Sequence, residues 1–359
     1  MINNNTLKQN SGKLSIKVIT QNDLIDAECF NIPEAFSVVE DAFVKKANDD
    51  VIFPDKVSVI FDEASQNRIN CLPAAIKSEL VYGMKWVSVF PGNPNLYGLQ
   101  NLSAVILLSE LQHGFPKAFM EGTLCSNLRT AATSAVAAKY LAKKDTEVIG
   151  FIGAGEQAKC HLMMMAYLFP KLKLCKVASR TNKSEILFIE KLSKLYPQIE
   201  FLACNNDFEK SARDSDIIVT AISGQERILQ GDWITKGALY CHVGGLEDDY
   251  SVVKKASKIV CDDWNVVKHR TQTISRMYKE NLLKDEDIYC NLTDLVSKKK
   301  NGRESEHEFI YFNTVGMSYV DVNLANYMFK KVSNKNLGTD IEIQSRAMFD
   351  VDYNKIILK

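Results

Sequence analysis

The chain has 359 residues, 46% of them apolar and 25% charged, which is typical of a globular protein long enough for two domains. Lysine plus arginine and aspartate plus glutamate each number 44, so the net charge is zero and the composition excludes a basic surface for nucleic acid. The nine cysteines are scattered without metal-ligand spacing, so we expect no metal site. The N-terminus is polar and no run of ~18 apolar residues occurs, so we expect a cytoplasmic protein without a membrane span.

The first 125 residues are dominated by short runs of β-type residues separated by polar or Gly/Pro-containing turns. One helix interrupts them at 33–48, with Pro33 in its first turn. The predicted strands cover residues 14–19, 57–61, 69–76, 82–90 and 103–111. This pattern predicts an antiparallel or mixed sheet.

From about residue 126 to 300, strands alternate with helices. A helix of small residues at 126–144 precedes a strand at 147–153. Helices at 156–169 and 183–196 then alternate with strands at 174–179, 199–204, 217–222 and 239–244. Such alternation predicts βαβ units and a parallel sheet. One more helix is expected at 316–336.

The segment Gly153-Ala154-Gly155-Glu156-Gln157-Ala158 fits the pattern G-x-G-x-x-G/A between a strand and a helix. In that context the glycines permit a tight turn and a close approach of the backbone to a pyrophosphate, so we expect a dinucleotide. The next strand ends at Ser179-Arg180-Thr181 without a carboxylate, which favours NADP over NAD. Alternatively, Arg180 is a solvated residue that stacks on adenine.

Three further features are candidates for the chemistry. Lys85 is a charged residue in an otherwise apolar strand, and Arg129 is the lone cation on a helix of small residues, suited to binding a carboxylate. The acidic run 247–249 follows a late strand, where the carboxyl ends of parallel strands face a ligand. Each also has a plain structural interpretation: an edge-strand lysine, an ion-pair partner and a solvated turn.

At these residues the sequence resembles the ornithine cyclodeaminase/mu-crystallin family. The resemblance runs from about residue 30 to 340 and includes YGMKWVSVFPGN, LRTAATSAVAAKYLA, IGFIGAGEQA and YFNTVGMSYVDVNLA. It implies an α/β protein in which a Rossmann-type parallel-sheet domain, residues 130–315, is inserted in a mixed α+β domain, residues 1–129 and 316–359. That second domain binds the substrate and forms the interface of a homodimer.

The resemblance also implies roles for individual residues. Lys85 corresponds to the lysine that contacts substrate and assists proton transfer, and Arg129 to the arginine that binds the α-carboxylate. A further family arginine near the first β-hairpin is absent or replaced by Lys56. The family's catalytic aspartate follows a Val-Gly-Gly strand end. A strict match to this sequence places Leu246 at the position of the aspartate, and a shift of the alignment by one residue places Glu247 there. We choose Glu247 as the catalytic residue, with Asp248 as the alternative.

Members of this family act on the C–N bond of small amino-acid-derived substrates with a nicotinamide cofactor, NAD or NADP here. The expected cofactor-binding residues are Thr130, Gly153, Ala154, Gly155, Gln157, Ser179, Arg180, Thr181, Ala221, Ser223, Val243 and Gly316. The most similar subgroup oxidises an N-substituted glutamate to 2,3-diaminopropionate and 2-oxoglutarate for siderophore or antibiotic synthesis. Ornithine cyclodeamination, imine reduction and a non-catalytic NADP-binding role like that of mu-crystallin are the alternatives.

Overall fold

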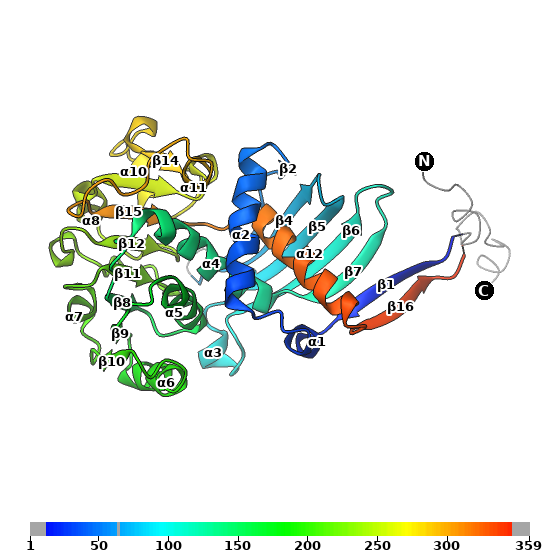
Figure 1. Ribbon diagram of the computed structural model, residues 1–359, viewed down its shortest axis with the longest axis horizontal. Helices are drawn as coiled ribbons and strands as arrows, with labels where there is room; N and C mark the ends of the chain where they lie inside the picture. The colour runs from blue at the N-terminus through cyan, green and yellow to red at the C-terminus, as the bar shows by residue number, and fades with distance from the viewer. Residues whose placement is uncertain (1–11, 63–64, 347–359) are drawn as a thin grey trace.

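The computed structural model describes residues 12–62 and 65–346, which form two sheets with helices packed on them (Figure 1). One sheet is built from residues 14–121 and 339–344, and the other from residues 148–313. The predicted fold class, a parallel-sheet domain inserted in a mixed α+β domain, is therefore confirmed. No helix in the described ranges is long and apolar enough to cross a membrane. The cysteines are all free thiols, and eight of them are buried.

The first sheet has the strand order β16-β1-β7-β6-β5-β4-β2, and β3 also pairs with β4. Its neighbours are antiparallel except for the parallel pair of β1 and β7. The strands are β1 (Leu14–Ile19), β2 (Val51–Ile52), β3 (Val57–Asp62), β4 (Asn67–Ile76), β5 (Val81–Val89), β6 (Leu102–Glu110), β7 (Pro116–Glu121) and β16 (Thr339–Gln344).

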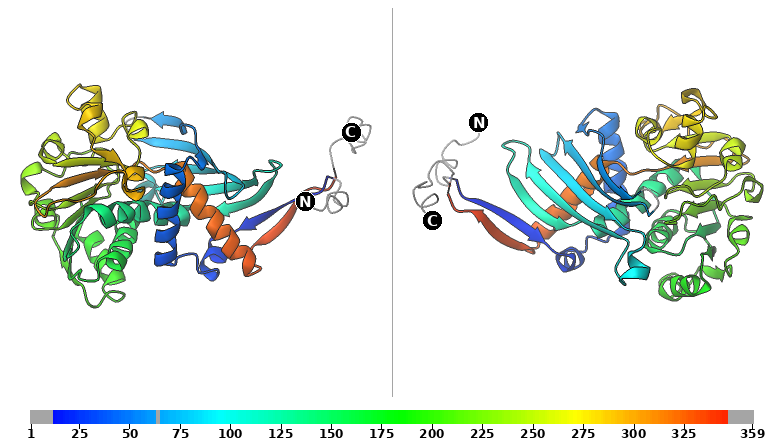
Figure 2. Two further views of the ribbon diagram at one scale, coloured as in Figure 1. Left: turned by 45° about the horizontal axis from the view of Figure 1, so that its top comes forward. Right: turned by 180° about the vertical axis from the view of Figure 1, so that it is seen from behind.

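Helix α12 (Ser318–Asn334) packs on one face of this sheet, and α2 (Ile32–Ala47) packs against α12 on the same side. In the described ranges no helix covers the other face (Figure 2). As predicted, Pro33 lies in the first turn of α2, and the Asn31 side chain caps that helix by accepting a hydrogen bond from Glu34 N. Two short helices, α1 (Gln21–Asp26) and α3 (Asn93–Leu96), lie in connections. Alternate residues of β5 are therefore buried under α12, and those between them face outward.

The second sheet is entirely parallel, with the order β10-β9-β8-β11-β12-β15-β13-β14. The strand order reverses between β8 and β11: β9 and β10 are added on one side of β8, and β11 and β12 on the other. Doubly wound sheets bind ligands at such a position, outside the carboxyl ends of the strands. The strands are β8 (Val148–Ile152), β9 (Leu174–Ala178), β10 (Glu200–Ala203), β11 (Ile217–Thr220), β12 (Leu239–His242), β13 (Lys258–Cys261), β14 (Cys290–Asn291) and β15 (Ile310–Asn313).

Helices surround this sheet and one of them joins it to the first (Figure 1). The joining helix, α4 (Thr123–Leu141), packs on α2 and on α5, and the predicted domain boundary at 129/130 falls inside it. The remaining helices are α5 (Glu156–Leu168), α6 (Asn182–Leu192), α7 (Phe208–Ala212), α8 (Tyr250–Lys255), α9 (Trp264–Val267), α10 (Thr273–Lys279), α11 (Leu292–Val296) and the 3₁₀ turns η1 (Gly231–Trp233) and η2 (Asp285–Asp287).

Candidate functional site

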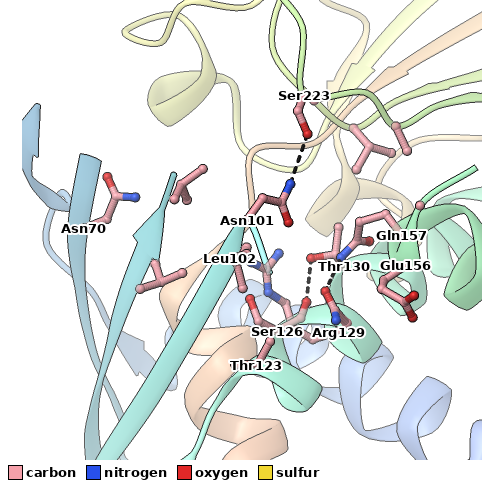
Figure 3. Close-up of a pocket in the computed structure, with 18 of the residues that line it drawn as sticks. Asn70, Asn101, Leu102, Thr123, Ser126, Arg129, Thr130, Glu156, Gln157 and Ser223 are labelled. Carbon is pink, nitrogen blue, oxygen red and sulfur yellow. Dashed lines mark hydrogen bonds between the residues drawn. The ribbon is translucent and has the colours of Figure 1, made fainter. Parts of the chain in front are cut away.

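A cavity of about 370 Å³ lies between the carboxyl ends of the parallel strands and the first sheet (Figure 3). The first sheet contributes side chains of β4, β5 and β6, and α4 closes one wall. The parallel-sheet domain contributes the glycine loop and the segments that follow β11, β12 and β15. Of the predicted site residues, the following line the cavity: Lys56, Lys85, Arg129, Thr130, Gly155, Gln157, Ala221, Ser223, Val243 and Gly316.

The glycine loop has the geometry that a dinucleotide requires. Gly153 has φ = +110°, and a Cβ there would lie 2.5 Å from the carbonyl oxygen of Ala221, so only glycine fits. A Cβ on Gly155 would meet no protein atom within 4 Å, which leaves the approach to the N-terminus of α5 open. Ala158 is buried at the start of that 13-residue helix. Backbone N–H groups at such a terminus favour phosphate, so the loop fits the pyrophosphate of a nicotinamide cofactor.

The predicted adenosine-side residues Ser179, Arg180 and Thr181 follow β9 and do not line the cavity. Arg180 and Thr181 are exposed. The nearby carboxylate of Glu185 is fully buried and accepts hydrogen bonds from the backbone N–H groups of Ser179, Asn205 and Asn206. Since its oxygens are occupied, Glu185 does not act as an acceptor for ribose hydroxyls. Ala154 of the glycine loop also lies outside the set of lining residues.

Lys85 and Arg129 share one buried carboxylate, that of Asp321 on α12. Asp321 Oδ1 lies 2.5 Å from Lys85 Nζ and 2.8 Å from Arg129 Nε. Lys85 also donates to Ser126 Oγ at 3.2 Å, and both Ser126 and Arg129 come from α4 (Figure 3). The side chains of Lys85 and Asp321 are 1% and 0% exposed, so this ion pair forms in a low-dielectric environment.

The environment of Lys85 brings its pKa close to neutrality. Burial and the positive charge of Arg129 lower the pKa, and the negative charge of Asp321 raises it, with a net decrease from 10.5 to about 8. A lysine with such a pKa can both accept and donate a proton near physiological pH. Lys85 therefore has the properties of an acid–base group at the cavity wall.

Further cations extend the site away from Lys85. Lys56 and Arg68 line the cavity and also an adjoining cavity of about 520 Å³, which Arg270 and His269 line as well. Burial lowers the pKa of Lys56 to about 7, and the charges of Arg270, Arg68, Lys85 and Arg129 act in the same direction. Arg270 Nε is a buried atom without a hydrogen-bond partner in the described part of the chain. This cationic subsite, Lys56, Arg68 and Arg270, is suited to anionic groups of a ligand.

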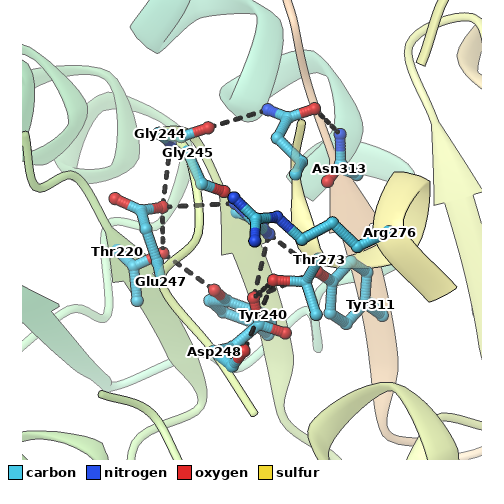
Figure 4. A network of polar contacts seen from close by, with 12 residues as sticks. Thr220, Tyr240, Gly244, Gly245, Glu247, Asp248, Thr273, Arg276, Tyr311 and Asn313 are labelled. Carbon is cyan, nitrogen blue, oxygen red and sulfur yellow. Dashed lines mark hydrogen bonds and ion pairs between the residues drawn. The ribbon is translucent and has the colours of Figure 1, made fainter. Parts of the chain in front are cut away.

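The structure places Glu247 outside the cavity, contrary to the catalytic position expected from the sequence. Its carboxylate is fully buried and accepts hydrogen bonds from Thr220 Oγ1 (2.7 Å), Ile222 N (2.7 Å) and Gly244 N (2.8 Å), as Figure 4 shows in part. The cause is the turn that follows β12, which points the side chain back under the strand ends.

Asp248, the alternative to Glu247, is also fully buried and does not line the cavity. It accepts a hydrogen bond from Thr273 Oγ1 at 2.6 Å and lies 3.1 Å from His242 Nδ1. The carboxylate that contacts Lys85 is Asp321, which the sequence interpretation missed. The sequence feature that could have identified Asp321 is a charged residue in the apolar first half of the predicted helix 316–336, just as Lys85 is a charged residue in an apolar strand.

Arg68, at the start of β4, lines the cavity together with Lys56 and was not among the residues predicted from the sequence. Arg270 follows α9 and was not among the predicted site residues either. Within residues 12–62 and 65–346, no group of three or more His, Cys, Asp or Glu side chains can hold a metal ion. The charged groups that this site brings together are those of the Lys85–Asp321–Arg129 cluster and of the cationic subsite.

A model of the ornithine cyclodeaminase/mu-crystallin family matches residues 16–336. The chain belongs to this family. It is 28% identical over 307 residues to the N-((2S)-2-amino-2-carboxyethyl)-L-glutamate dehydrogenase of Staphylococcus aureus, covering 84% of this chain and 91% of that protein. It is 29% identical over 332 residues to the alanine dehydrogenase of Archaeoglobus fulgidus, covering 90% and 98%.

Among solved structures, the chain is similar to the Δ1-pyrroline-2-carboxylate reductase of Thermococcus litoralis, determined in complex with NADH and L-proline. The TM-score is 0.86 at 29% identity, and the match covers 91% of this chain and all of that one. These relatives are dehydrogenases or reductases. The predictions of the family, of an NAD(P)-dependent enzyme and of its cofactor class are therefore confirmed.

Proposed function

We propose that this protein oxidises an N-substituted glutamate with NAD(P), releasing 2-oxoglutarate and a primary amine, which we expect to be 2,3-diaminopropionate. The observation that carries the proposal is the cationic subsite. Arg129 suffices for one α-carboxylate, whereas Lys56, Arg68 and Arg270 add three cationic side chains in the same cleft. Buried cations are stabilised by partners of opposite charge, and N-(2-amino-2-carboxyethyl)glutamate carries three carboxylates. Alanine and pyrroline-2-carboxylate carry one each.

In the proposed reaction, Arg129 binds the substrate and Lys85 transfers protons. Arg129 uses Nε to bind Asp321, so the terminal nitrogens of its guanidinium are available for a two-pronged contact with the glutamate α-carboxylate. Neutral Lys85 accepts the proton of the secondary ammonium, which frees the nitrogen lone pair. When bound, NAD(P)⁺ supplies the two-electron oxidant that accepts a hydride from the glutamate α-carbon.

Hydrolysis then separates the products. Water adds to the C=N double bond, Lys85 returns a proton to the nitrogen, and the C–N bond breaks to give the ketone of 2-oxoglutarate and the free amine. The balance is one amine, one NAD(P)⁺ and one water consumed, and one 2-oxo acid, one primary amine, one NAD(P)H and one proton released.

We also propose that the protein is a homodimer that buries the open face of the first sheet. Tyr82, Trp86 and Phe119 on this face are 40%, 44% and 43% exposed and form an apolar surface of the kind that marks an interface. The archaeal alanine dehydrogenase of similar structure is described as a dimer. Light scattering is expected to give twice the chain mass for the native protein and the chain mass for Trp86→Lys. A monomeric native protein would contradict the proposal.

The catalytic proposal is tested by following nicotinamide absorbance. N-(2-amino-2-carboxyethyl)glutamate should reduce NAD⁺ or NADP⁺ and release stoichiometric 2-oxoglutarate, and Lys85→Ala should abolish both. Tyr82→Phe, on the outer face of the same strand, is the matched control and should retain activity. Oxidation of alanine, or oxidation of reduced cofactor by pyrroline-2-carboxylate, with no turnover of the tricarboxylate would instead assign the reaction of the other relatives. Ornithine converted to proline and ammonia without net cofactor reduction would assign cyclodeamination.

A further inference from the structure

Glu247 is the centre of a buried charged network under the carboxyl ends of β11 and β12 (Figure 4). Its two oxygens accept three hydrogen bonds, two of them from backbone N–H groups. Oε2 also lies 3.5 Å from Nε2 of His242. The side chain is fully buried and does not line the cavity, so it is poorly placed to take a proton from a substrate or from water.

His242 is the buried side chain that lies closest to the carboxylates of both Glu247 and Asp248 among the ion pairs of this network. Burial lowers its pKa, but the charges of Asp248 and Glu247 act in the other direction, and the net effect raises the pKa above 6.5. Its Nδ1 faces Tyr311 Oη at 2.7 Å and Asp248, and its Nε2 faces the carbonyl of Gly245 at 2.7 Å. Both ring nitrogens therefore have acceptors, which suits the doubly protonated ring.

The backbone groups that Glu247 holds belong to the two segments that form one wall of the cleft. Ile222 follows β11 and Gly244 follows β12, and both line the main cavity. A Cβ on Gly244 would lie 2.3 Å from Glu247 Oε1, so the fit leaves no space for a side chain. The carbonyl of Gly244 in turn accepts from Gln272 Nε2, which also donates to Thr314 O after β15. The network thus joins three strand ends at the cavity.

We propose that Glu247 is a positioning residue that fixes the segments after β11 and β12 in the geometry that binds the nicotinamide half of the cofactor. Proton transfer is left to Lys85, more than 150 residues earlier in the chain. The proposal rests on the proposed function only in naming the cofactor.

Glu247→Gln tests this assignment, because it retains the size of the side chain but turns an NH₂ group towards one of the backbone donors. A positioning role predicts that the Kd and KM for the dinucleotide rise on the order of 10-fold, with kcat at saturation changed by less than about 3-fold. The limb of the pH profile near the Lys85 pKa of about 8 should stay in place. A catalytic base at Glu247 predicts the opposite: kcat lower by about 10²–10⁴-fold, unchanged dinucleotide affinity and a lost limb.

Asp216→Asn is the matched control. The Asp216 carboxylate also accepts hydrogen bonds from two backbone N–H groups, Glu147 and Val148, but at the amino ends of the strands, away from the cavity. It should lower the melting temperature without changing dinucleotide affinity. Equal loss of affinity in both variants would overturn the proposal, since the effect would then be one of general stability.

Dinucleotide affinity is measured by calorimetry without substrate, so the result stands even if no substrate is turned over. If Glu247→Gln does not fold, Thr220→Val removes one hydrogen bond to the same carboxylate, together with the hydrogen bond between Thr220 Oγ1 and Tyr240 Oη. Affinity weakened by about two- to fivefold would support the proposal, and unchanged affinity would refute it.

Discussion

The charge of Asp321 is expected to set the pH range in which the enzyme works. In the direction of amine oxidation Lys85 must be neutral to accept a proton, so kcat/KM should rise with pH through the Lys85 pKa of about 8. Asp321, 2.5 Å from Lys85 Nζ, raises that pKa. Removing an opposite charge at such a distance lowers a lysine pKa by roughly one to three pH units. In Asp321→Asn the pH at which kcat/KM rises should therefore move to between roughly pH 5 and 7.

The assay is kcat/KM for the amine substrate at saturating dinucleotide, measured from pH 5 to 10 in buffers of constant ionic strength. The variant also leaves Lys85 and Arg129 without their shared carboxylate, so we expect the free energy of unfolding to fall by on the order of 3–5 kcal/mol. The loss is smaller at a pH where Lys85 is neutral, because an uncharged amine does not need the carboxylate. Glu79→Gln is the control, because Glu79 pairs with Lys45 outside the cavity. A limb that remains at pH 8 in Asp321→Asn would refute the assignment of this titration to Lys85.

Three further variants test other parts of the site. Arg68→Met should raise KM for a tricarboxylate substrate by about 10-fold or more and leave dinucleotide affinity unchanged, as measured by initial-rate kinetics. Equal KM values in the variant and the wild type would show that Arg68 does not bind the substrate. Arg180→Ala should raise KM for NADP about 10-fold and leave KM for NAD unchanged, and parallel changes would contradict 2′-phosphate binding. Gly155→Leu should abolish binding of both dinucleotides by calorimetry at an unchanged melting temperature, because its Cβ meets no protein atom within 4 Å; retained binding would place the pyrophosphate elsewhere.

Much of the fold could be predicted because its signals are local. The run from β8 through the glycine loop to α5 combines β-branched residues, two glycines and a helix within 21 consecutive residues, and the structure has each element within two residues of its predicted bounds. Strands β7, β13, β15 and β16 were not predicted. All four, like the two-residue strands β2 and β14 that were also not predicted, are six residues or shorter and lie next to polar or glycine-containing turns, so hydrophobic pattern alone did not separate them from loops.

Site residues could be predicted where a charged residue lies in an element that otherwise consists of apolar or small residues, as Lys85 and Arg129 do. The partner of both, Asp321, lies 236 residues from Lys85 in the chain, and only the packing of α12 on the first sheet brings them together. Glu247 was misplaced for the complementary reason. An acid after a Val-Gly-Gly strand end can face the cavity or the strand ends beneath it, and the turn after β12 decides between these directions.

The division of polar groups between the two sides of the cleft has a consequence for specificity. On the parallel-sheet side, the wall next to Lys85 consists of backbone and small side chains, such as Ala221, Val243 and Gly316. The groups that can exchange protons or bind carboxylates come mainly from the first sheet, α4 and α12. With the exception of Arg270, we therefore expect separate parts of the chain to carry dinucleotide binding and substrate choice, so that substitutions of Lys56 and Arg68 change the substrate without altering the cofactor site. We therefore expect the reactions of the relatives, on alanine, pyrroline-2-carboxylate or an N-substituted glutamate, to be distinguished by the cations on β4 and the segment before β3.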